Sequence, residues 1–242
     1  MTAADRYPTA AAVIVAAGSS TRMGAEGTRK PLLALRGRPV LEHACAAFDA
    51  AATVREIIVV AHADDLATIE RWCAERPAFD KVRAVVAGGA ERAESVRRGV
   101  RWCAFGPAVI CVHDAARPLV QAARIDAVVR RAAEAGAALL AHPVRDTLKR
   151  SADGAFAEST VDRSGLFAAE TPQAFAARPF RELLARAERE AFSPTDDAAL
   201  WERYRGPVAL VEGELANLKL TAPPDLFLAE AILDARAAEA LP

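Results

Sequence analysis

The sequence predicts an α/β protein in which helices cover both faces of a mostly parallel sheet. One observation is a set of six short apolar runs, rich in β-branched residues, at residues 11–17, 56–62, 82–88, 108–114, 137–144 and 207–213. A second is that helical patterns, with apolar residues three and four positions apart, lie between most of these runs. Continuous apolar runs are typical of strands buried on both faces, so the two observations together predict a three-layer sandwich.

The predicted elements alternate in a regular order. The first strand, in "AAVIVAA", ends at Ala17 and leads into a polar loop that contains glycines and basic residues. Helical spacing follows at residues 40–51, 66–76, 94–104 and 124–135, each time between two of the strand-like runs. The last helix is expected at residues 223–241, where a pair of prolines precedes a long apolar pattern.

One segment, residues 145–165, breaks this alternation. Its sequence, "RDTLKRSADGAFAESTVDRSG", is polar, and the turn signal "ADG" separates two stretches with the character of hairpin strands. Such a hairpin buries little of itself, so we expect it to pack against another surface, most simply a second copy of the chain. Residues 1–242 are therefore expected to form a single domain with an arm at about 143–165.

Composition limits the classes of function. The 242 residues carry 31 basic and 32 acidic side chains, so the chain as a whole lacks the basic face that nucleic-acid binding requires. No apolar run approaches the roughly 18 residues of a membrane helix. The four cysteines form no CxxC pair, which argues against a zinc site or a disulfide framework and indicates reduced, buried thiols in a cytoplasmic protein.

The residues that follow each predicted strand are candidates for a site, because open parallel sheets bind ligands at the carboxyl ends of their strands. These segments are expected to gather five cations around one cleft: Arg22, Lys30, Arg92, Arg117 and Lys219. In a chain with almost no net charge, this local excess predicts a polyanion site. Asp114 stands among the cations, and a carboxylate in that position is typical of a site where Mg²⁺ bridges the protein to phosphates.

The loop after the first strand resembles a phosphate loop but fits neither common template. A Walker loop needs GxxxxGK[ST], and no Lys-Ser or Lys-Thr pair follows Gly24. A dinucleotide fingerprint needs GxGxxG, and Ser20 stands two positions after Gly18. About a dozen residues separate Gly18 from Lys30, a length that lets backbone amides and two side chains wrap a triphosphate.

Six motifs in a fixed order carry a resemblance to a known family. They are "AAGSSTRMG…RKPLL", "GGAERAESV" (88–96), "VHDAARP" (112–118), "PVRDTLKR" (143–150), "TVDRSGLFAAETPQAF" (160–175) and "VEGELANLKLT" (211–221). Over about residues 11–233 the chain resembles the 2-C-methyl-D-erythritol 4-phosphate cytidylyltransferases of the non-mevalonate isoprenoid pathway. The resemblance implies a Rossmann-like, GT-A-like nucleotidyltransferase fold and a homodimer formed through the protruding β-hairpin arm.

The resemblance also implies a reaction and a set of roles. Methylerythritol phosphate attacks the α-phosphorus of CTP in line and pyrophosphate leaves, so catalysis rests on positioning and charge stabilisation. By motif position, Arg22 and Lys30 stabilise the triphosphate, and the cytidine is contacted by Ala16, Ala17, Gly18, Gly89 and Ser95. Asp114 lies near Mg²⁺ and the sugar, and the methylerythritol phosphate is held by Arg117, Arg163 and Lys219. Thr147 reaches the neighbouring subunit's site.

The loop departs from the family's pattern at several positions. Ser20 stands where the family often has a second glycine, and Ala90 stands where a polar residue often touches the nucleotide. Arg29 takes the place of a proline before the lysine, and the loop is longer than usual. We therefore expect either Lys30 or Arg29 to reach the triphosphate.

Two other functions are consistent with parts of the pattern. A ribitol-5-phosphate cytidylyltransferase shares the fold and the cytidine loop, although "TVDRSGLF" and "NLKLT" favour the erythritol substrate. A non-catalytic nucleotide-binding subunit is expected to lack Arg22 or Asp114, and both are present. Some nearby polar residues have a structural interpretation. The pair Asp196 and Asp197 suits the start of a helix, with Thr195 or Asp196 as its cap, and His113 suits the end of a buried strand.

Overall fold

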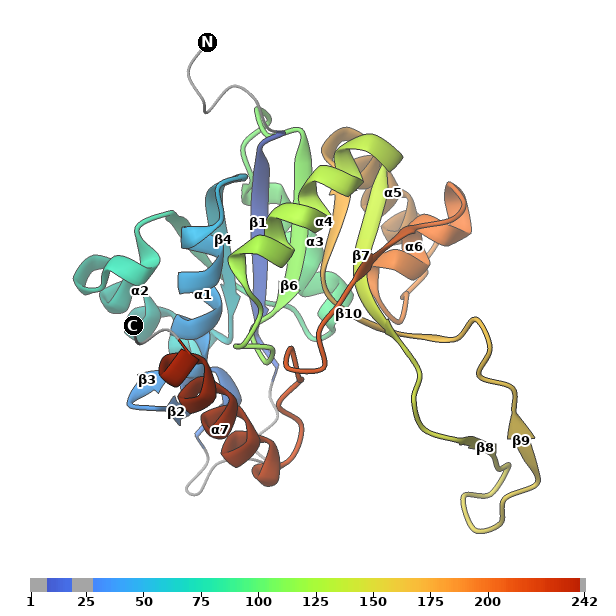
Figure 1. The fold of residues 1–242 in the computed structure, drawn as a ribbon. Helices are drawn as coiled ribbons and strands as arrows, with labels where there is room; N and C mark the ends of the chain where they lie inside the picture. Colours follow the sequence, from blue (N-terminus) through green and yellow to red (C-terminus); the bar gives the residue numbers. More distant parts are fainter. Residues whose placement is uncertain (1–7, 19–27, 240–242) are drawn as a thin grey trace.

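The computed structural model describes residues 8–18 and 28–239, and its centre is a seven-stranded sheet between two layers of helices (Figure 1). The strands are β1 (Ala10–Ala16), β4 (Val54–Ala61), β5 (Val82–Ala87), β6 (Val109–Asp114), β7 (Ala137–Pro143), β10 (Phe167–Ala176) and β11 (Ala209–Glu212). They lie in the order β11-β7-β10-β6-β1-β4-β5. Only β10 runs antiparallel to its neighbours, so the predicted mostly parallel sheet is confirmed.

Helices cover both faces of this sheet. The described α-helices are α1 (Val40–Ala50), α2 (Leu66–Glu75), α3 (Arg92–Trp102), α4 (Ala122–Ala135), α5 (Ala177–Arg189), α6 (Asp197–Tyr204) and α7 (Pro223–Glu239), and the 3₁₀ turns are η3 (Lys30–Leu32), η4 (Ala63–Asp65) and η5 (Pro77–Phe79). One core joins the sheet to α1, α2 and α4, and the other joins it to α3, α5 and α6. The predicted three layers are thus present.

Strand β1 shows why its sequence is a continuous apolar run. Ile14 packs into the core that contains Phe48 of α1, whereas its neighbour Val13 packs into the core that contains Val96 of α3. Successive side chains of a strand point to opposite faces, and here both faces are covered, so an apolar side chain is favoured at every position. Helix α7 packs instead on a smaller cluster beside the short strands β2 (Ala34–Leu35) and β3 (Arg38–Pro39).

Strand β10 is absent from the set of strands that the apolar pattern predicts. Its centre consists of Glu170, Thr171, Pro172 and Gln173, which are all buried. Polar residues and a proline interrupt the apolar run by which a buried strand is recognised. The structure satisfies the Glu170 carboxylate from elsewhere in the fold, so the strand is stable despite its composition.

Between β7 and β10 the chain forms the predicted hairpin. Strands β8 (Leu148–Arg150) and β9 (Ser159–Val161) pair antiparallel, and the hairpin projects away from the central sheet (Figure 1). Most residues from 145 to 167 are exposed, including Phe156, whose exposed fraction is 75%. The hairpin is confirmed, and its role as a dimerisation arm stays a prediction.

The cysteines are unpaired, as the sequence predicts. Cys45, Cys103 and Cys111 are buried and Cys73 is half-buried, and all four are free thiols. Burial raises the pKa of the Cys73 thiol to about 11, so it is protonated at neutral pH. Among residues 8–18 and 28–239, no helix combines the length and apolarity needed to cross a membrane.

Candidate active site

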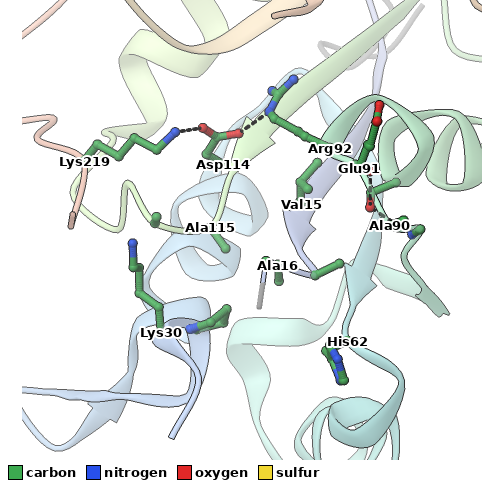
Figure 2. Close-up of a pocket in the computed structure, with 16 residues that line it drawn as sticks. Val15, Ala16, Lys30, His62, Ala90, Glu91, Arg92, Asp114, Ala115 and Lys219 are labelled. Atoms are coloured by element: carbon green, nitrogen blue, oxygen red, sulfur yellow. Dashed lines mark hydrogen bonds and ion pairs between the residues drawn. The ribbon is translucent and has the colours of Figure 1, made fainter. Parts of the chain in front are cut away.

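A pocket of about 470 Å³ lies at the carboxyl edge of the parallel strands (Figure 2). Its wall is formed by the end of β1, by η3, by the segment from Gly89 to the first turns of α3, by the end of β6 and by Lys219. Eight residues expected in the site line it together: Ala16, Ala17, Gly18, Lys30, Gly89, Ser95, Asp114 and Lys219. The structure therefore gathers these eight residues, from separate parts of the chain, around one cavity.

Small residues allow the segments that directly follow β1 and β5 to approach closely. A Cβ on Gly88 would lie 2.2 Å from the Cβ of Ala17 and 2.9 Å from the Ser95 hydroxyl, so only glycine fits there. The backbone N–H of Gly89 donates to Ser95 Oγ at 3.0 Å. Helix α3 begins just beyond, and its N-terminal N–H groups favour an anion in the pocket.

Asp114, at the end of β6, holds two cations at once. Its Oδ1 accepts from Nε of Arg92 at 2.9 Å, and its Oδ2 accepts from Nζ of Lys219 at 2.7 Å (Figure 2). Burial by itself raises the pKa of this carboxyl, but the positive charges of Arg92 and Lys219 outweigh burial and hold its pKa well below the ordinary value. Asp114 is therefore a carboxylate, and it orients both cations.

Arg92 lies between two carboxylates. Besides Asp114, its Nη1 lies 2.9 Å from Oδ2 of Asp197, the first residue of α6. Burial lowers the pKa of Arg92, but the charges of Asp197 and Asp114 raise it above the ordinary value. Asp196, not Asp197, caps α6, because its side chain accepts from the N–H of Ala199 at 2.8 Å. The predicted cap is thus confirmed for Asp196, and Asp197 has a different partner.

Arg29 and Lys30 are neighbours in the chain, but the structure gives their side chains different surroundings. Lys30 lines the pocket and donates from Nζ to the carbonyl of Leu220 at 2.7 Å, next to Lys219 in the chain. Arg29 instead donates from Nε to Asp65 at 2.6 Å and is not among the residues that line the pocket. Of these two cations, Lys30 is therefore the one that lines the pocket, and its contact with a triphosphate stays a prediction.

Arg117 lies beside the pocket rather than in its wall. Its Nη1 donates to the carbonyl of Asn217 at 2.8 Å, and its own carbonyl contacts Nε2 of His113 at 3.0 Å. The other ring nitrogen of His113 lies 3.1 Å from the hydroxyl of Thr171, so this buried histidine is fully engaged, as expected for a structural residue. Arg117 thus joins the end of β6 to the loop that carries Lys219.

Two of the expected site residues lie elsewhere in the described part of the chain. Thr147 and Arg163 belong to the arm segment and do not line the pocket of their own chain. Arg163 donates through its guanidinium to the carbonyl of Arg145 at the base of the arm. Arg22 falls outside the described residues. The roles expected of these three residues stay predictions.

Some residues near the pocket carried no functional expectation. His62 follows β4 directly and lines the pocket, with its Nδ1 accepting from the N–H of Asp64 at 3.3 Å. His62 could have been predicted to line the pocket, because it directly follows a strand and ligands bind at the carboxyl ends of such strands. Glu170 is also informative: its two oxygens contact Nδ1 of His142 at 2.7 Å and Nδ2 of Asn217 at 2.6 Å. No local pattern indicates that second cluster, because its members are far apart in sequence.

The fold and pocket together define a class of protein. A sheet with helices on both faces and, at its carboxyl edge, a pocket lined by small residues, two lysines, a helix N-terminus and a carboxylate is the arrangement expected of a protein that handles nucleotides. Comparison with known proteins gives the particular family. A family model described as 2-C-methyl-D-erythritol 4-phosphate cytidylyltransferase matches residues 10–235. The chain belongs to this family and is a cytidylyltransferase.

Relatives support this assignment over nearly the full length. A protein of Syntrophotalea carbinolica named 2-C-methyl-D-erythritol 4-phosphate cytidylyltransferase is 43% identical over 223 residues, covering 92% of this chain and 95% of the relative. One of Bacillus velezensis with the same name is 43% identical over 224 residues, covering 92% and 95%. The crystal structure of the Thermus thermophilus enzyme has a TM-score of 0.76 at 33% identity and covers 94% of this chain and 99% of that one.

Proposed function

We propose that the pocket at the carboxyl edge of the sheet is where this chain transfers the cytidylyl group of CTP to 2-C-methyl-D-erythritol 4-phosphate. The products are 4-diphosphocytidyl-2-C-methyl-D-erythritol and pyrophosphate. The observation that carries the proposal is the convergence of Lys30, Lys219 and the start of α3 on one cavity with Asp114 in its wall. Such a cavity suits two phosphorylated substrates that react with each other.

The nucleotide half of the site is assigned to the small residues. Ala16, Ala17, Gly18, Gly89 and Ser95 line one part of the pocket, where backbone groups can contact the base and ribose at close range. Lys30, together with Arg22 from the preceding loop, is assigned to the triphosphate. These cations stabilise the charge that grows as the bond between the α-phosphorus and pyrophosphate breaks.

The other half of the site is assigned to methylerythritol phosphate. Lys219 and Arg117 are the cations on this side, and Asp114 orients Lys219. The phosphate oxygen of this substrate attacks the α-phosphorus of CTP and forms the new P–O bond. It needs no strong base, because the attacking group is already an anion; positioning and charge stabilisation supply the rate.

Magnesium is assigned to the substrate triphosphate rather than to a site built by the protein alone. Within residues 8–18 and 28–239, no group of three or more His, Cys, Asp or Glu could hold a metal ion. Asp114 is a single carboxylate, which suits Mg²⁺ because this ion usually takes one or two carboxylates plus phosphates and waters. Bound there, the ion would neutralise phosphate charge. Its contact with Asp114 requires a carboxylate oxygen now held by Arg92 or Lys219.

The arm is assigned to a homodimer. Among the described residues, its strands β8 and β9 pair with each other alone and most of the hairpin is exposed, so it is suited to reach a second copy of the chain. Thr147 and Arg163 would then contribute to the partner's pocket, where Arg163 would contact methylerythritol phosphate. Free, protonated thiols are consistent with a reducing cytoplasm as the compartment.

The test is release of pyrophosphate from CTP in the presence of Mg²⁺ and either methylerythritol phosphate or ribitol 5-phosphate. We expect turnover with the erythritol substrate, and turnover with ribitol 5-phosphate alone would contradict the proposal. Lys30→Ala is expected to lower kcat by about 10²-fold, the scale of losing one charge stabiliser. Arg178→Ala, at a surface arginine that pairs only with Glu182 in the described contacts, is the matched control.

A further inference from the structure

Four charged residues are joined by successive ion pairs, and three of the four line the pocket. Lys219 contacts Asp114 at 2.7 Å, Asp114 contacts Arg92 at 2.9 Å, and Arg92 contacts Asp197 at 2.9 Å. They come from four separate segments: the loop before α7, the end of β6, the start of α3 and the start of α6. The first three line the pocket and are labelled in Figure 2, whereas Asp197 is not among the residues that line it. Two cations thus alternate with two anions.

Asp197 is a buried carboxylate whose cationic partner among the described residues is Arg92. The cap of α6 is supplied by Asp196, so Asp197 is not needed for it. Its exposed fraction is 2%, and among the described residues no donor meets its Oδ2 in hydrogen-bonding geometry. Burial raises the pKa of Asp197, and Arg92 opposes that increase. A buried carboxylate is costly unless a cation is held next to it, so the fold keeps Asp197 as the counter-charge of Arg92.

The planar guanidinium of Arg92 allows two of its nitrogens to face two different carboxylates. Nε donates to Asp114 and Nη1 lies 2.9 Å from Oδ2 of Asp197, so one planar group faces two carboxylates. The compact ammonium of a lysine lacks this fork. With Oδ1 of Asp114 occupied by Arg92, the second oxygen is left for Lys219. The orientation of Lys219 therefore depends on Arg92 through Asp114.

We propose that Arg92 is a positioning residue for the methylerythritol phosphate half of the site and that Asp197 is the buried anchor that holds Arg92. The inference rests on the proposed function, which assigns Lys219 to that substrate. Arg92 orients the Asp114 carboxylate, Asp114 orients the Lys219 ammonium, and Lys219 meets the substrate phosphate. The cytidine contacts at Gly18 and Gly89 take no part in these ion pairs.

The experiment compares Arg92→Lys and Asp197→Asn with the wild type. Both variants are near in size to the original residue, and each removes one link: the fork or the buried counter-charge. In each we measure kcat/KM for methylerythritol phosphate at saturating CTP, the Kd for CTP alone, and Tm. We expect kcat/KM for methylerythritol phosphate to fall about 10-fold or more through misplacement of Lys219. The Kd for CTP should change less than about twofold, since CTP binding does not depend on this geometry.

Asp196→Asn is the matched control, because it removes a negative charge one residue away and asparagine also caps helices well. It should leave kcat/KM within about twofold of the wild type. The proposal is overturned if Arg92→Lys and Asp197→Asn also leave kcat/KM for methylerythritol phosphate within about twofold of the wild type. It is equally overturned if they weaken CTP binding and methylerythritol phosphate turnover in parallel, because Arg92 would then contact the nucleotide or act only through stability. Failure of the proposed function would look different: wild type and Lys219→Ala would not differ in turnover.

Discussion

Arg29 and Asp65 form a two-pronged ion pair that joins the residue before η3 to η4, the turn that follows β4. Nε of Arg29 lies 2.6 Å from Oδ2 of Asp65, and Nη2 lies 2.5 Å from Oδ1. Asp65 is buried, and Asp64 adds a weaker contact at 3.3 Å. Lys30, the next residue in the chain, lines the pocket. The ion pair therefore fixes where the 3₁₀ turn begins and which of the two cations faces the pocket.

The first prediction concerns this pair. Arg29→Ala is expected to raise the KM for CTP about 10-fold, because Lys30 loses its anchor, while kcat falls less than in Lys30→Ala. It should also lower the free energy of unfolding by about 2 kcal/mol, since the buried Asp65 loses its cation. Steady-state kinetics and urea unfolding measure the two effects. The control is Arg29→Lys, which keeps the charge and should recover part of the stability; equal KM values in Arg29→Ala and wild type would contradict the prediction.

A second prediction follows from the close approach of β1 and β5. Gly88→Ala places a Cβ 2.2 Å from the Cβ of Ala17, so the strand ends must separate. We expect a loss of about 1–3 kcal/mol in the free energy of unfolding, typical of overpacking, and a Kd for CTP raised about 10-fold. Gly106→Ala is the control, because nothing lies within 4 Å of the Cβ it adds. Calorimetric titration with CTP would contradict the prediction if both variants bound equally well.

A third prediction concerns pH and His113. Burial lowers the pKa of this imidazole from 6.5 to about 4 in the folded chain. Below pH 6.5 the unfolded chain therefore binds more protons than the folded chain, so stability is fully present above pH 6.5 and is lost as the pH falls toward 4. The loss is expected to reach about 3 kcal/mol. Urea unfolding of wild type and His113→Gln at pH 7.0, 5.5 and 4.5 measures it, and identical pH slopes in the two proteins would rule out this role for His113.

The fourth prediction tests the arm. Co-expressed chains carrying Arg163→Ala or Lys219→Ala are each expected to be inactive alone. If Arg163 acts in the partner's pocket, half of the pockets in each mixed dimer contain no substitution and half contain both. Random pairing should then restore about a quarter of wild-type activity. If Arg163 acts in its own chain's pocket, no pocket in the mixture is intact and no activity returns. Light scattering on the same samples checks that dimers are present.

Much of the fold could be predicted from local pattern. The parallel strands and the helices between them follow from apolar periodicity, because each residue's burial is set by the geometry of its own element. Strand β10 could not be predicted this way. Its buried Glu170 is stable only because His142 and Asn217, which come from distant segments, contact both carboxylate oxygens. By itself, the sequence of β10 is two short apolar stretches separated by Glu170, Thr171, Pro172 and Gln173, which is not the continuous apolar run of a buried strand.

The candidate site also has features that the sequence predicts and features that only the structure shows. The residue types that follow each strand indicated an anion pocket before any geometry was available, because parallel strands present their carboxyl ends at one edge. The sequence does not show which carboxylate each of these cations pairs with. Arg29 and Lys30 are adjacent and both cationic, and only the position of Asp65 separates their roles. Likewise, the sequence predicts Thr195 or Asp196 as the helix cap, and the structure shows Asp196 in that role, but the sequence does not indicate that Asp197 pairs with Arg92.

By itself, then, the sequence determined the class of fold, the family and the edge of the sheet where the chemistry lies. These depend on periodicity, small residues and motif order, which are properties of neighbouring residues. Only the tertiary structure decided how the charges pair: Lys219 with Asp114, Arg92 between Asp114 and Asp197, and Arg29 with Asp65. An ion pair depends on distance in space and on burial, and residues far apart in the chain meet only when the sheet and its helices have packed.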